Sequence, residues 1–373
     1  MKIAILKERR NGETRVAATP DTVKKLVAGG HDIRIEKGAG DAASLPDNAY
    51  EAAGAKTGTL AATLKGADAI FCVRAPDDAT LAKLPKGILL VGQIEPHGNK
   101  ALAKVLADAG IDSLAMEFTP RITRAQAMDA LSSQSNLAGY RAVIEASGLY
   151  GRAFPMMMTA AGTIAPAKAF VMGAGVAGLQ AIATARRLGA MVSATDVRPA
   201  AKEQVASLGA KFIAVEDEEF KAAETAGGYA KEMSAEYRAK QAELVAAHIA
   251  KQDVVVTTAL IPGRPAPKLI TKKMVEAMKP GSVIVDLAAA MGGNCELTKA
   301  DEVVEHQGVK IAGYANLPGR LAADASALYA KNLVNLLPLL VAEDGAKAPQ
   351  WEDEIIAAMA ITRDGKIVHD TLK

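Results

Sequence analysis

A glycine-rich turn between two apolar segments constrains this 373-residue chain more than any other feature. Residues 169–172 are apolar, residues 173–178 read Gly-Ala-Gly-Val-Ala-Gly, and residues 179–188 continue with helical spacing. A second apolar segment, residues 190–195, ends at Asp196. A bare glycine triplet also occurs in ordinary turns, but the order strand, glycine turn, helix, strand and acid is the context of a dinucleotide-binding fingerprint. The segment therefore predicts a dinucleotide site.

Each glycine of this fingerprint has its own mechanical role. Gly173 permits the tight turn, Gly175 lets the backbone approach the pyrophosphate, and Gly178 lets the helix pack on the strand. The phosphates then lie at the positive end of the helix dipole. We expect further cofactor contacts from residues within this turn or after the neighbouring strands: Val176, Ala177, Val197, Ala259 and Leu260.

The acid at the end of the second strand favours NAD over NADP. The Asp196 carboxylate can accept the adenosine ribose hydroxyls and would repel a 2′-phosphate. Arg198 lies two residues on and could hold such a phosphate, so the alternative stays open. We predict NAD(H) as the cofactor.

Composition excludes several other classes of protein. The net charge is +2 and basic residues are interspersed with acidic ones, so we expect no nucleic-acid partner. Cys72 and Cys295 have no metal-ligand spacing and lie in apolar or small-residue stretches, which suits reduced, buried thiols in the cytosol and no metal. Residues 1–7 are too short an apolar run for a signal peptide, and no run of about eighteen apolar residues predicts a membrane span.

Strands and helices alternate in two separate series, which indicates an α/β fold with two Rossmann-like, doubly wound parallel sheets. The length also allows two domains. In the first third, strands are expected near residues 2–7, 32–36, 69–73, 88–94 and 112–116. In the middle, six are expected near residues 169–172, 191–195, 211–215, 254–258, 282–286 and 310–313.

Two long helical segments, residues 125–151 and 323–341, are expected to cross between the domains. The tail after residue 341 would then return to the first domain and make it discontinuous. We expect domains of residues 1–130 plus 322–373 and of residues 131–321, with substrate meeting cofactor between them.

The connection of residues 216–252 is longer than a simple crossover needs. Residues 231–248 predict a solvated, charged helix with i to i+4 pairs. Residues 227–233 favour a mobile lid, because Gly228 lends flexibility beside Tyr229, an aromatic side chain that could close over a bound cofactor.

A second polar segment follows the last strand of the first series. Arg121, Gln126 and Asp129 could hydrogen-bond a carboxamide, ribose or pyrophosphate there, at the sheet edge where α/β proteins bind ligands. Ser132 to Asn136 continue the polar run. From the residues alone, a helix cap with a solvated turn is as well supported as a site.

Residues 121–141 resemble the segment characteristic of the NAD(H)-binding component of proton-translocating nicotinamide nucleotide transhydrogenase. Residues 173–180, 224–233 and 292–294 resemble other segments of that component, so the resemblance covers nearly the whole chain. It implies that Arg121, Gln126 and Asp129 line the nicotinamide end of the NAD(H) site and act catalytically. It also implies that the loop around Tyr229 closes on the nucleotide, with Ser132 and Asn136 among the cofactor contacts.

The resemblance implies partners as well. NADP(H) would be bound by a partner subunit that carries the membrane domain, and hydride transfer would be coupled to proton translocation. This chain would be cytoplasmic, peripheral on the inner face of the bacterial inner membrane. A homodimer is expected, with residues 154–163 resembling a hairpin at its interface, whose exposed apolar strand would otherwise favour aggregation.

A free-standing alanine dehydrogenase shares this architecture and is the main alternative. Its acid and base residues are not matched here: Arg15 fits its arginine, but Arg74 stands at its lysine and residues 93–95 around its histidine. Ala290 and Met291 precede the Gly-Gly pair where it has aspartate, and His97 is off register in what we expect to be a solvent-facing loop.

Hydride transfer between two nicotinamides needs apposition but no general base. Only one complete fingerprint is present, since residues 38–40 lack the third glycine and predict a structural turn. The second nucleotide must therefore come from a partner. A non-catalytic NAD-binding protein remains a third interpretation.

Overall fold

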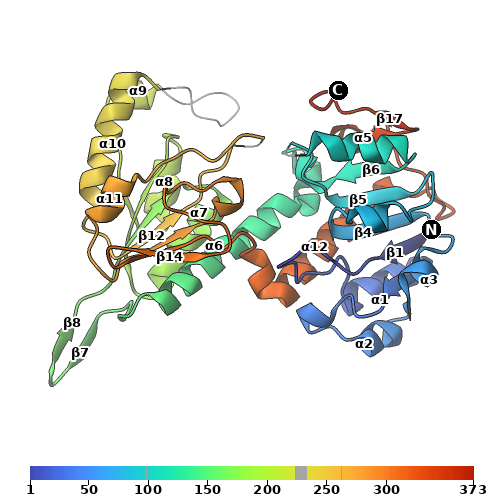
Figure 1. Ribbon diagram of the computed structural model, residues 1–373, viewed down its shortest axis with the longest axis horizontal. Helices are drawn as coiled ribbons and strands as arrows, with labels where there is room; N and C mark the ends of the chain where they lie inside the picture. The colour runs from blue at the N-terminus through green and yellow to red at the C-terminus, as the bar shows by residue number, and fades with distance from the viewer. Residues whose placement is uncertain (98, 223–232, 262) are drawn as a thin grey trace. The chain divides into compact units, whose positions relative to one another are not determined.

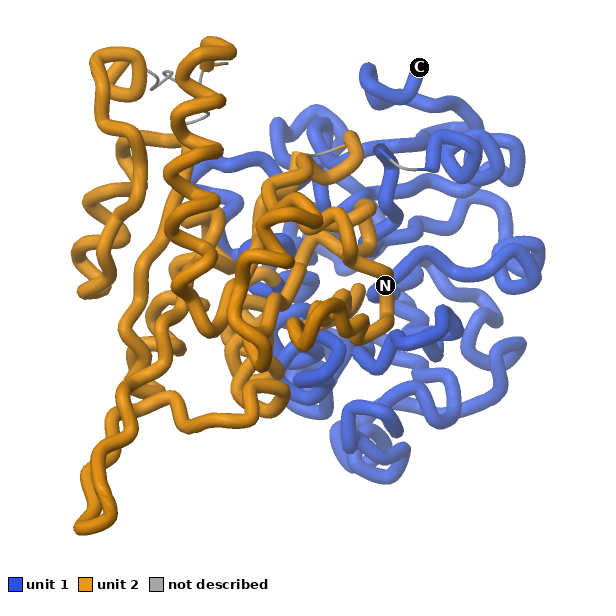
Figure 2. Tube along the Cα trace, turned by 60° about the vertical axis from the view of Figure 1, so that its left-hand side comes forward, with its two compact units in different colours: residues 1–134, 318–373 blue, residues 135–317 orange. Residues whose placement is uncertain are grey.

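The computed structural model describes residues 1–97, 99–222, 233–261 and 263–373, which form two compact units (Figure 2). Unit 1 contains Met1–Gln134 and Pro318–Lys373, and unit 2 contains Ser135–Leu317. The helix α6 (Ala130–Leu149) carries the chain from the first unit into the second. The chain returns just before α12 (Ala322–Leu336).

Unit 1 is built on an eight-stranded sheet of order β17-β16-β6-β5-β4-β1-β2-β3 (Figure 1). Six strands are parallel: β1 (Lys2–Ile5), β2 (Asp32–Glu36), β3 (Lys56–Gly58), β4 (Ala69–Arg74), β5 (Leu89–Gln93) and β6 (Asp112–Ala115). The C-terminal tail adds β16 (Ala360–Arg363) antiparallel to β6, followed by β17 (Lys366–Ile367). The helices of the unit are α1 (Pro20–Ala28), α2 (Asp47–Ala52), α3 (Leu60–Leu64), α4 (Asp78–Leu81), α5 (Lys100–Asp108), α12 and α13 (Glu354–Met359).

Unit 2 is built on a seven-stranded sheet of order β11-β10-β9-β12-β13-β15-β14. Its strands are β9 (Lys168–Met172), β10 (Met191–Thr195), β11 (Lys211–Phe212), β12 (Val254–Thr257), β13 (Val283–Asp286), β14 (Val303–His306) and β15 (Val309–Ala312). Its further helices are α7 (Val176–Arg187), α8 (Ala201–Ser207), α9 (Glu218–Lys221), α10 (Ala235–Ile249) and α11 (Lys272–Glu276). Alternate residues of β9 belong to two different apolar clusters, so both faces of this sheet are covered.

The predicted fold class is confirmed, and the structure adds four short strands that the sequence did not predict: β3, β14, β16 and β17. The helix expected over residues 125–151 is wrong at its start. A 3₁₀ segment occupies Thr123–Met128, and α6 begins afterwards because Asp129 accepts a hydrogen bond from the Ser132 N–H and caps it. The helix expected to reach residue 341 ends at Leu336, and the 3₁₀ turn Leu337–Leu339 follows because Pro338 lacks the N–H that a helix interior needs.

A two-stranded hairpin, β7 (Met157–Thr159) and β8 (Gly162–Ile164), extends away from the large sheet of unit 2 (Figure 1). All six of its strand residues are exposed, among them Met157, Met158 and Ile164. Two strands alone are marginally stable in water. The hairpin therefore presents an apolar surface that is not covered within unit 2.

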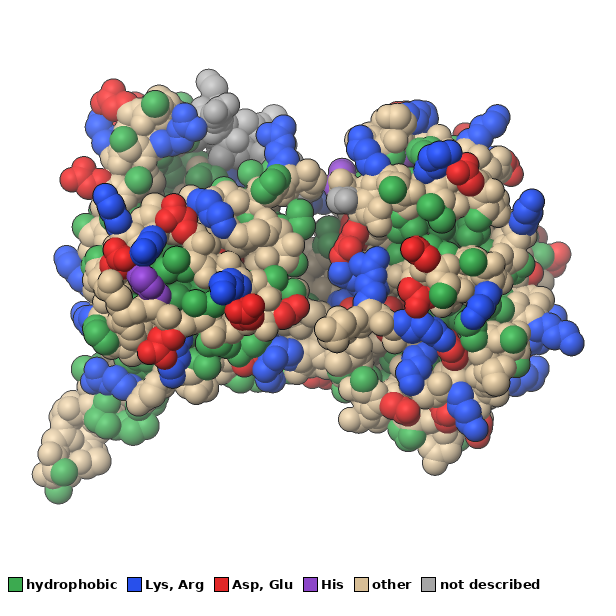
Figure 3. Space-filling model, viewed as in Figure 1, with side chains coloured by type: hydrophobic (Ala, Val, Ile, Leu, Met, Phe, Trp, Pro, Cys, Tyr) green, Lys and Arg blue, Asp and Glu red, His purple; other side chains and the backbone are tan. Residues whose placement is uncertain are grey.

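Acidic and basic side chains are interspersed over the face drawn in Figure 3. Within the described ranges, no helix combines the length and the apolar character that a bilayer crossing requires. The described residues also contain no group of three or more histidine, cysteine, aspartate or glutamate residues placed to hold a metal ion. Cys72 and Cys295 are both buried.

Candidate nucleotide site

The glycine turn of unit 2 connects β9 to α7, at the carboxyl edge of the sheet. Gly173 has a φ of +106°, a conformation that side-chain-bearing residues rarely adopt. A Cβ on Gly178 would lie 1.8 Å from the carbonyl oxygen of Gly173, so only glycine lets the helix approach the strand this closely. A Cβ on Gly175, the N-cap of α7, would meet no protein atom within 4 Å. The middle glycine therefore borders open space at the helix N-terminus, where a phosphate would be stabilised.

Asp196 follows β10 and is tied to the glycine turn. Its Oδ2 accepts the Ala174 N–H at 2.7 Å, and its two oxygens accept Arg198 Nε at 2.9 Å and Nη2 at 3.0 Å. Burial alone would raise the pKa of Asp196, but the hydrogen bonds from Arg198 and Ala174 outweigh it and hold the pKa below its usual value. The carboxylate is thus ionised, only 7% exposed, and already neutralises the guanidinium beside it.

The loop after β12 borders the same turn. The Thr258 hydroxyl donates to the Gly173 carbonyl at 3.2 Å, and a Cβ on Gly173 would lie 2.4 Å from that hydroxyl oxygen. Ala259 is half-buried and Leu260 is exposed. Large apolar side chains are exposed on the loops around the glycine turn, as in a site that awaits an apolar ring: Val176, Val197, Leu260 and Ile261.

The helix α6 lies directly against the start of α7. A Cβ on Gly139 would be 2.0 Å from the Ala177 carbonyl oxygen, so the two helices meet backbone to backbone at this glycine. One turn earlier on α6, the Asn136 amide nitrogen donates to Gln180 Oε1 at 3.4 Å. The structure therefore brings Asn136 to the first helix of the predicted fingerprint. The sequence reasoning did not single out Gly139 or Thr258, since their partners are distant in the chain.

The other predicted residues lie in unit 1, on the segment between β6 and α6. Arg121 and Gln126 are exposed. Asp129 accepts both the N–H and the hydroxyl of Ser132, so these two residues are bonded to each other as the helix cap that the residue pattern allowed. The Ser132 hydroxyl and the Asp129 carboxylate thus form one polar unit at the start of α6.

The segment that carries Gln126 is braced from outside. Asn332 and Asn335 of α12 both donate to the Ala127 carbonyl, at 2.8 and 3.0 Å. The Arg124 guanidinium pairs with Asp353 at 2.7 Å, which ties the segment to the residue that precedes α13. Because such bracing fixes the backbone, the exposed Gln126 side chain projects from a firmly held loop. Asn332 and Asn335 are far away along the chain, and the sequence reasoning missed them.

The predicted lid residues Gly228 and Tyr229 lie outside the described residues. On either side of them, Phe220, Met233 and Tyr237 form a small buried cluster. The charged helix predicted nearby is present as α10, which begins after its N-cap Ser234.

Comparison with known proteins identifies the family. The family model described as alanine dehydrogenase/PNT, N-terminal domain, matches residues 4–138, and the model described as alanine dehydrogenase/PNT, C-terminal domain, matches residues 142–370. This chain belongs to the alanine dehydrogenase/PNT family. Because this family includes NAD(H)-binding proteins, the cofactor class predicted from the glycine turn is supported.

The most informative relatives of this alanine dehydrogenase/PNT chain are transhydrogenases. A chain of NAD(P) transhydrogenase subunit alpha from Rhodospirillum rubrum is 55% identical, over 100% of this chain and 99% of its own length. The crystal structure of a transhydrogenase from Sinorhizobium meliloti matches with a TM-score of 0.91 and 55% identity, over 99% of this chain and 100% of that one. Alanine dehydrogenase of Halomonas elongata is 31% identical, over 99% of this chain and 95% of its own length.

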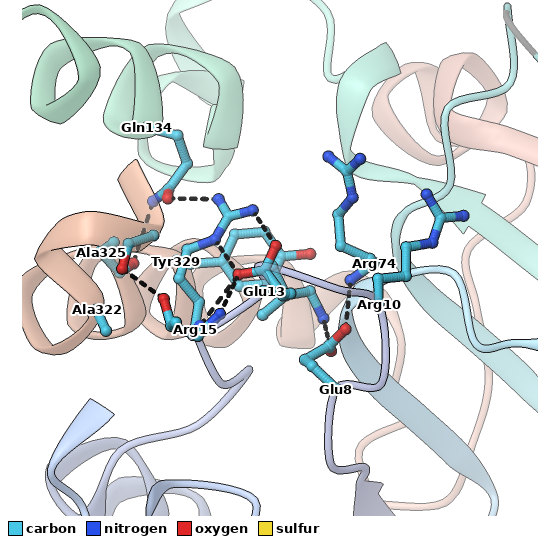
Figure 4. Close-up of polar contacts among 12 residues, drawn as sticks. Glu8, Arg10, Glu13, Arg15, Arg74, Gln134, Ala322, Ala325 and Tyr329 are labelled. Atoms are coloured by element: carbon cyan, nitrogen blue, oxygen red, sulfur yellow. Dashed lines mark hydrogen bonds and ion pairs between the residues drawn. The ribbon is translucent and has the colours of Figure 1, made fainter. Parts of the chain in front are cut away.

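Arg15, the residue matched to the arginine of the family's dehydrogenases, is engaged inside unit 1 (Figure 4). Its Nε and Nη2 donate to the two oxygens of Glu13, both at 2.7 Å, and its Nη1 donates to Gln134 Oε1 at 2.8 Å. Gln134 in turn donates to the Ala325 carbonyl of α12. Because the side chains of Arg15 and Glu13 are 3% and 4% exposed, this pair is a buried structural ion pair rather than an open carboxylate receptor.

Glu95 lies where the sequence of a family dehydrogenase would place its histidine, and it binds two arginines. Arg10 Nη1 donates to Glu95 Oε2 at 2.9 Å, and Arg74, which stands at the dehydrogenase lysine, pairs with the other oxygen. Beside them, burial raises the pKa of Glu8 to about 7, although its carboxylate accepts the N–H groups of Val73 and Arg74. His97 is exposed, as predicted, and its ring contacts Phe118 edge to face. A dehydrogenase-like proton relay is therefore not assembled among these residues.

Proposed function

We propose that this chain is the NAD(H)-binding catalytic subunit, subunit alpha, of a proton-translocating NAD(P) transhydrogenase. The observation that carries the proposal is the combination of one complete nucleotide turn with Glu95, paired to two arginines, where an amino acid dehydrogenase needs histidine. A hydride donor and acceptor site without acid or base groups fits transfer between two nicotinamide rings. The identity of 55% to the Rhodospirillum rubrum subunit, against 31% to an alanine dehydrogenase, supports the same choice.

In this proposal unit 1 is the N-terminal alanine dehydrogenase/transhydrogenase-like domain and unit 2 is the NAD(H)-binding domain. The hydride, with its electron pair, leaves C4 of NADH and joins C4 of NADP⁺, and no proton is exchanged at that step. NADP⁺ is held by the NADP(H)-binding domain of a membrane-embedded partner, which couples the transfer to proton translocation. The chain itself is cytoplasmic and peripheral, on the inner face of the bacterial inner membrane.

The residues have separate tasks in this mechanism. The N–H groups at the start of α7 hold the pyrophosphate and Asp196 accepts the ribose hydroxyls, with no metal involved. Arg121, Gln126 and Asp129 orient the nicotinamide end, with Ser132 fixing Asp129 through the cap. Gly228 and Tyr229 close over the nucleotide. Orientation is the main contribution, since a well-placed donor and acceptor remove much of the barrier.

The decisive test mixes this chain with a purified NADP(H)-binding transhydrogenase domain and follows oxidation of NADH by an NADP⁺ analogue. We expect rapid exchange that depends on the partner, and no NAD⁺ reduction by L-alanine without it. Alanine-dependent reduction by the chain alone would establish the dehydrogenase alternative. NADH binding with no exchange would establish a non-catalytic NAD-binding protein.

Within that assay, Gln126→Asn should slow hydride transfer by roughly tenfold to a hundredfold, because shortening the side chain misplaces the ring it orients. NADH affinity should change by less than about threefold, since the pyrophosphate and ribose contacts of unit 2 remain. Gln204→Asn, an exposed glutamine on α8, is the control. Equal losses of rate and affinity in Gln126→Asn would make this residue a general binding group.

We also propose that the hairpin docks a second copy of this chain. Met157 lies opposite Ile164 on one face, and Met158 lies opposite Thr163 on the other. Met157→Lys should weaken the dimer at least about tenfold, because it buries a charge in an apolar interface. Sedimentation velocity over a dilution series measures this, and Thr163→Lys, on the opposite face, is the matched control. An unchanged mass for Met157→Lys would contradict this interface.

A further inference from the structure

Asn294 is a buried amide that joins two segments of unit 2. It follows Gly292 and Gly293, which both have positive φ, and it is completely buried. Its Oδ1 accepts the Ala259 N–H at 3.0 Å, and its Nδ2 donates to the carbonyl oxygens of Ala259 at 2.8 Å and Pro267 at 2.9 Å. The side chain therefore pairs with both backbone groups of Ala259, as a neighbouring strand would.

Ala259 is a consequential residue to hold, because of what surrounds it. It directly follows Thr258, whose hydroxyl donates to the carbonyl of Gly173 in the glycine turn. It directly precedes Leu260 and Ile261, whose side chains are 52% and 46% exposed. Asn294 thus fixes the backbone on which two exposed apolar side chains stand beside the glycine turn.

Asn294 is itself held in place from β13. Asp286, completely buried at the end of that strand, accepts the N–H of Cys295 at 3.0 Å and the hydroxyl of Thr298 at 2.6 Å. A Cβ on Gly293 would lie 2.8 Å from the Asp286 carboxylate, so the chain passes close to it. The connection runs from the sheet through Asp286 to Asn294, and from there to Ala259.

The strand order says which half of a dinucleotide Ala259 faces. Asp196, the ribose acid of the adenosine half, follows β10 on one side of β9, whereas Ala259 follows β12 on the other side. A dinucleotide spans the carboxyl edge across this switch point, with one mononucleotide on each side. The loop after β12 therefore belongs to the nicotinamide half.

We infer that Asn294 is a positioning residue for the nicotinamide half of NAD(H): it holds Ala259 so that Leu260 and Ile261 form an apolar wall beside the ring. This inference rests on the proposed NAD(H) site. It assigns Asn294 no contact with the cofactor, and it predicts that loss of the amide acts through the loop after β12 rather than on the adenosine half.

The test is Asn294→Asp, which keeps the acceptor for the Ala259 N–H but replaces the two donated bonds by an oxygen facing two carbonyls. We expect NADH affinity to fall roughly tenfold or more, and 5′-AMP affinity to stay within about twofold, both by titration calorimetry. Gln252→Glu is the matched control: this buried amide donates to the His248 carbonyl and lies at the opposite end of β12.

The outcomes separate the two proposals. If wild-type protein fails to bind NADH, the proposed function itself fails. If the wild type binds NADH but Asn294→Asp weakens NADH and 5′-AMP equally, or Gln252→Glu shows the same NADH-selective loss, the positioning role is overturned. Should Asn294→Asp not fold, Asn294→Ser, a neutral side chain that cannot span all three partners, is measured against the same criteria, with thermal unfolding as the folding check.

Discussion

Replacing Gly178 by alanine should weaken NADH binding by about tenfold or more and lower the free energy of unfolding by about 1–3 kcal/mol. The added methyl would lie 1.8 Å from the Gly173 oxygen and 2.8 Å from its carbonyl carbon. Both atoms are backbone, so no side chain can rotate away, and α7 must move off β9. Its N-terminal N–H groups would then no longer meet the pyrophosphate. Urea unfolding and titration calorimetry measure the two effects.

Gly175→Ala is the matched control for this prediction. A methyl here meets no protein atom within 4 Å, and the residue has a φ of −76°, which alanine adopts readily. We expect unchanged stability but weaker NADH binding, because the methyl occupies the space that the phosphates approach. Two outcomes would contradict the assigned geometry: a Gly178→Ala protein as stable as the wild type, or a Gly175→Ala protein with normal affinity.

Local features of this fold were predictable from the sequence, because their causes are local. The turn at residues 173–178 needs its glycines for a positive φ and for contact between consecutive elements, and both requirements appear in the motif itself. The parallel strands of both sheets were found from apolar runs, apart from the three-residue β3. The strands that were missed are short edge or tail strands, such as β17 with two residues, which carry too few side chains for a period to appear.

The tertiary supports of the candidate site could not be predicted in this way. Asn294 closes on Ala259, and Gly139 meets Ala177, across connections that only the folded topology brings together. An isolated asparagine after two glycines looks like any turn residue. Asp129 shows the opposite case, since its hydrogen bonds to Ser132 are the local cap that the residue pattern already allowed. Its capping role and its proposed role at the nicotinamide are compatible because a carboxylate has several acceptor positions.

Asp196→Ala should weaken NADH binding roughly tenfold to a hundredfold and, at the same time, strengthen NADPH binding. The carboxylate supplies charged acceptors for the ribose hydroxyls, each worth about 1.5–3 kcal/mol. It also occupies Arg198, whose Nε and Nη2 both donate to it in the free protein. Without Asp196 the 2′-phosphate meets no repulsion and finds a free guanidinium at the same place, the pairing that NADP-binding proteins use.

The double variant Asp196→Ala/Arg198→Ala isolates the second effect. It should bind NADH as weakly as Asp196→Ala but lose the gain for NADPH, because no guanidinium remains for the 2′-phosphate. Titration calorimetry with both nucleotides gives the four affinities, and raising the salt concentration should reduce the NADPH gain of the single variant. Wild-type NADH affinity in Asp196→Ala would contradict the placement of the ribose. An NADPH gain that survives in the double variant would mean that removing the carboxylate's repulsion, rather than releasing Arg198, sets the preference.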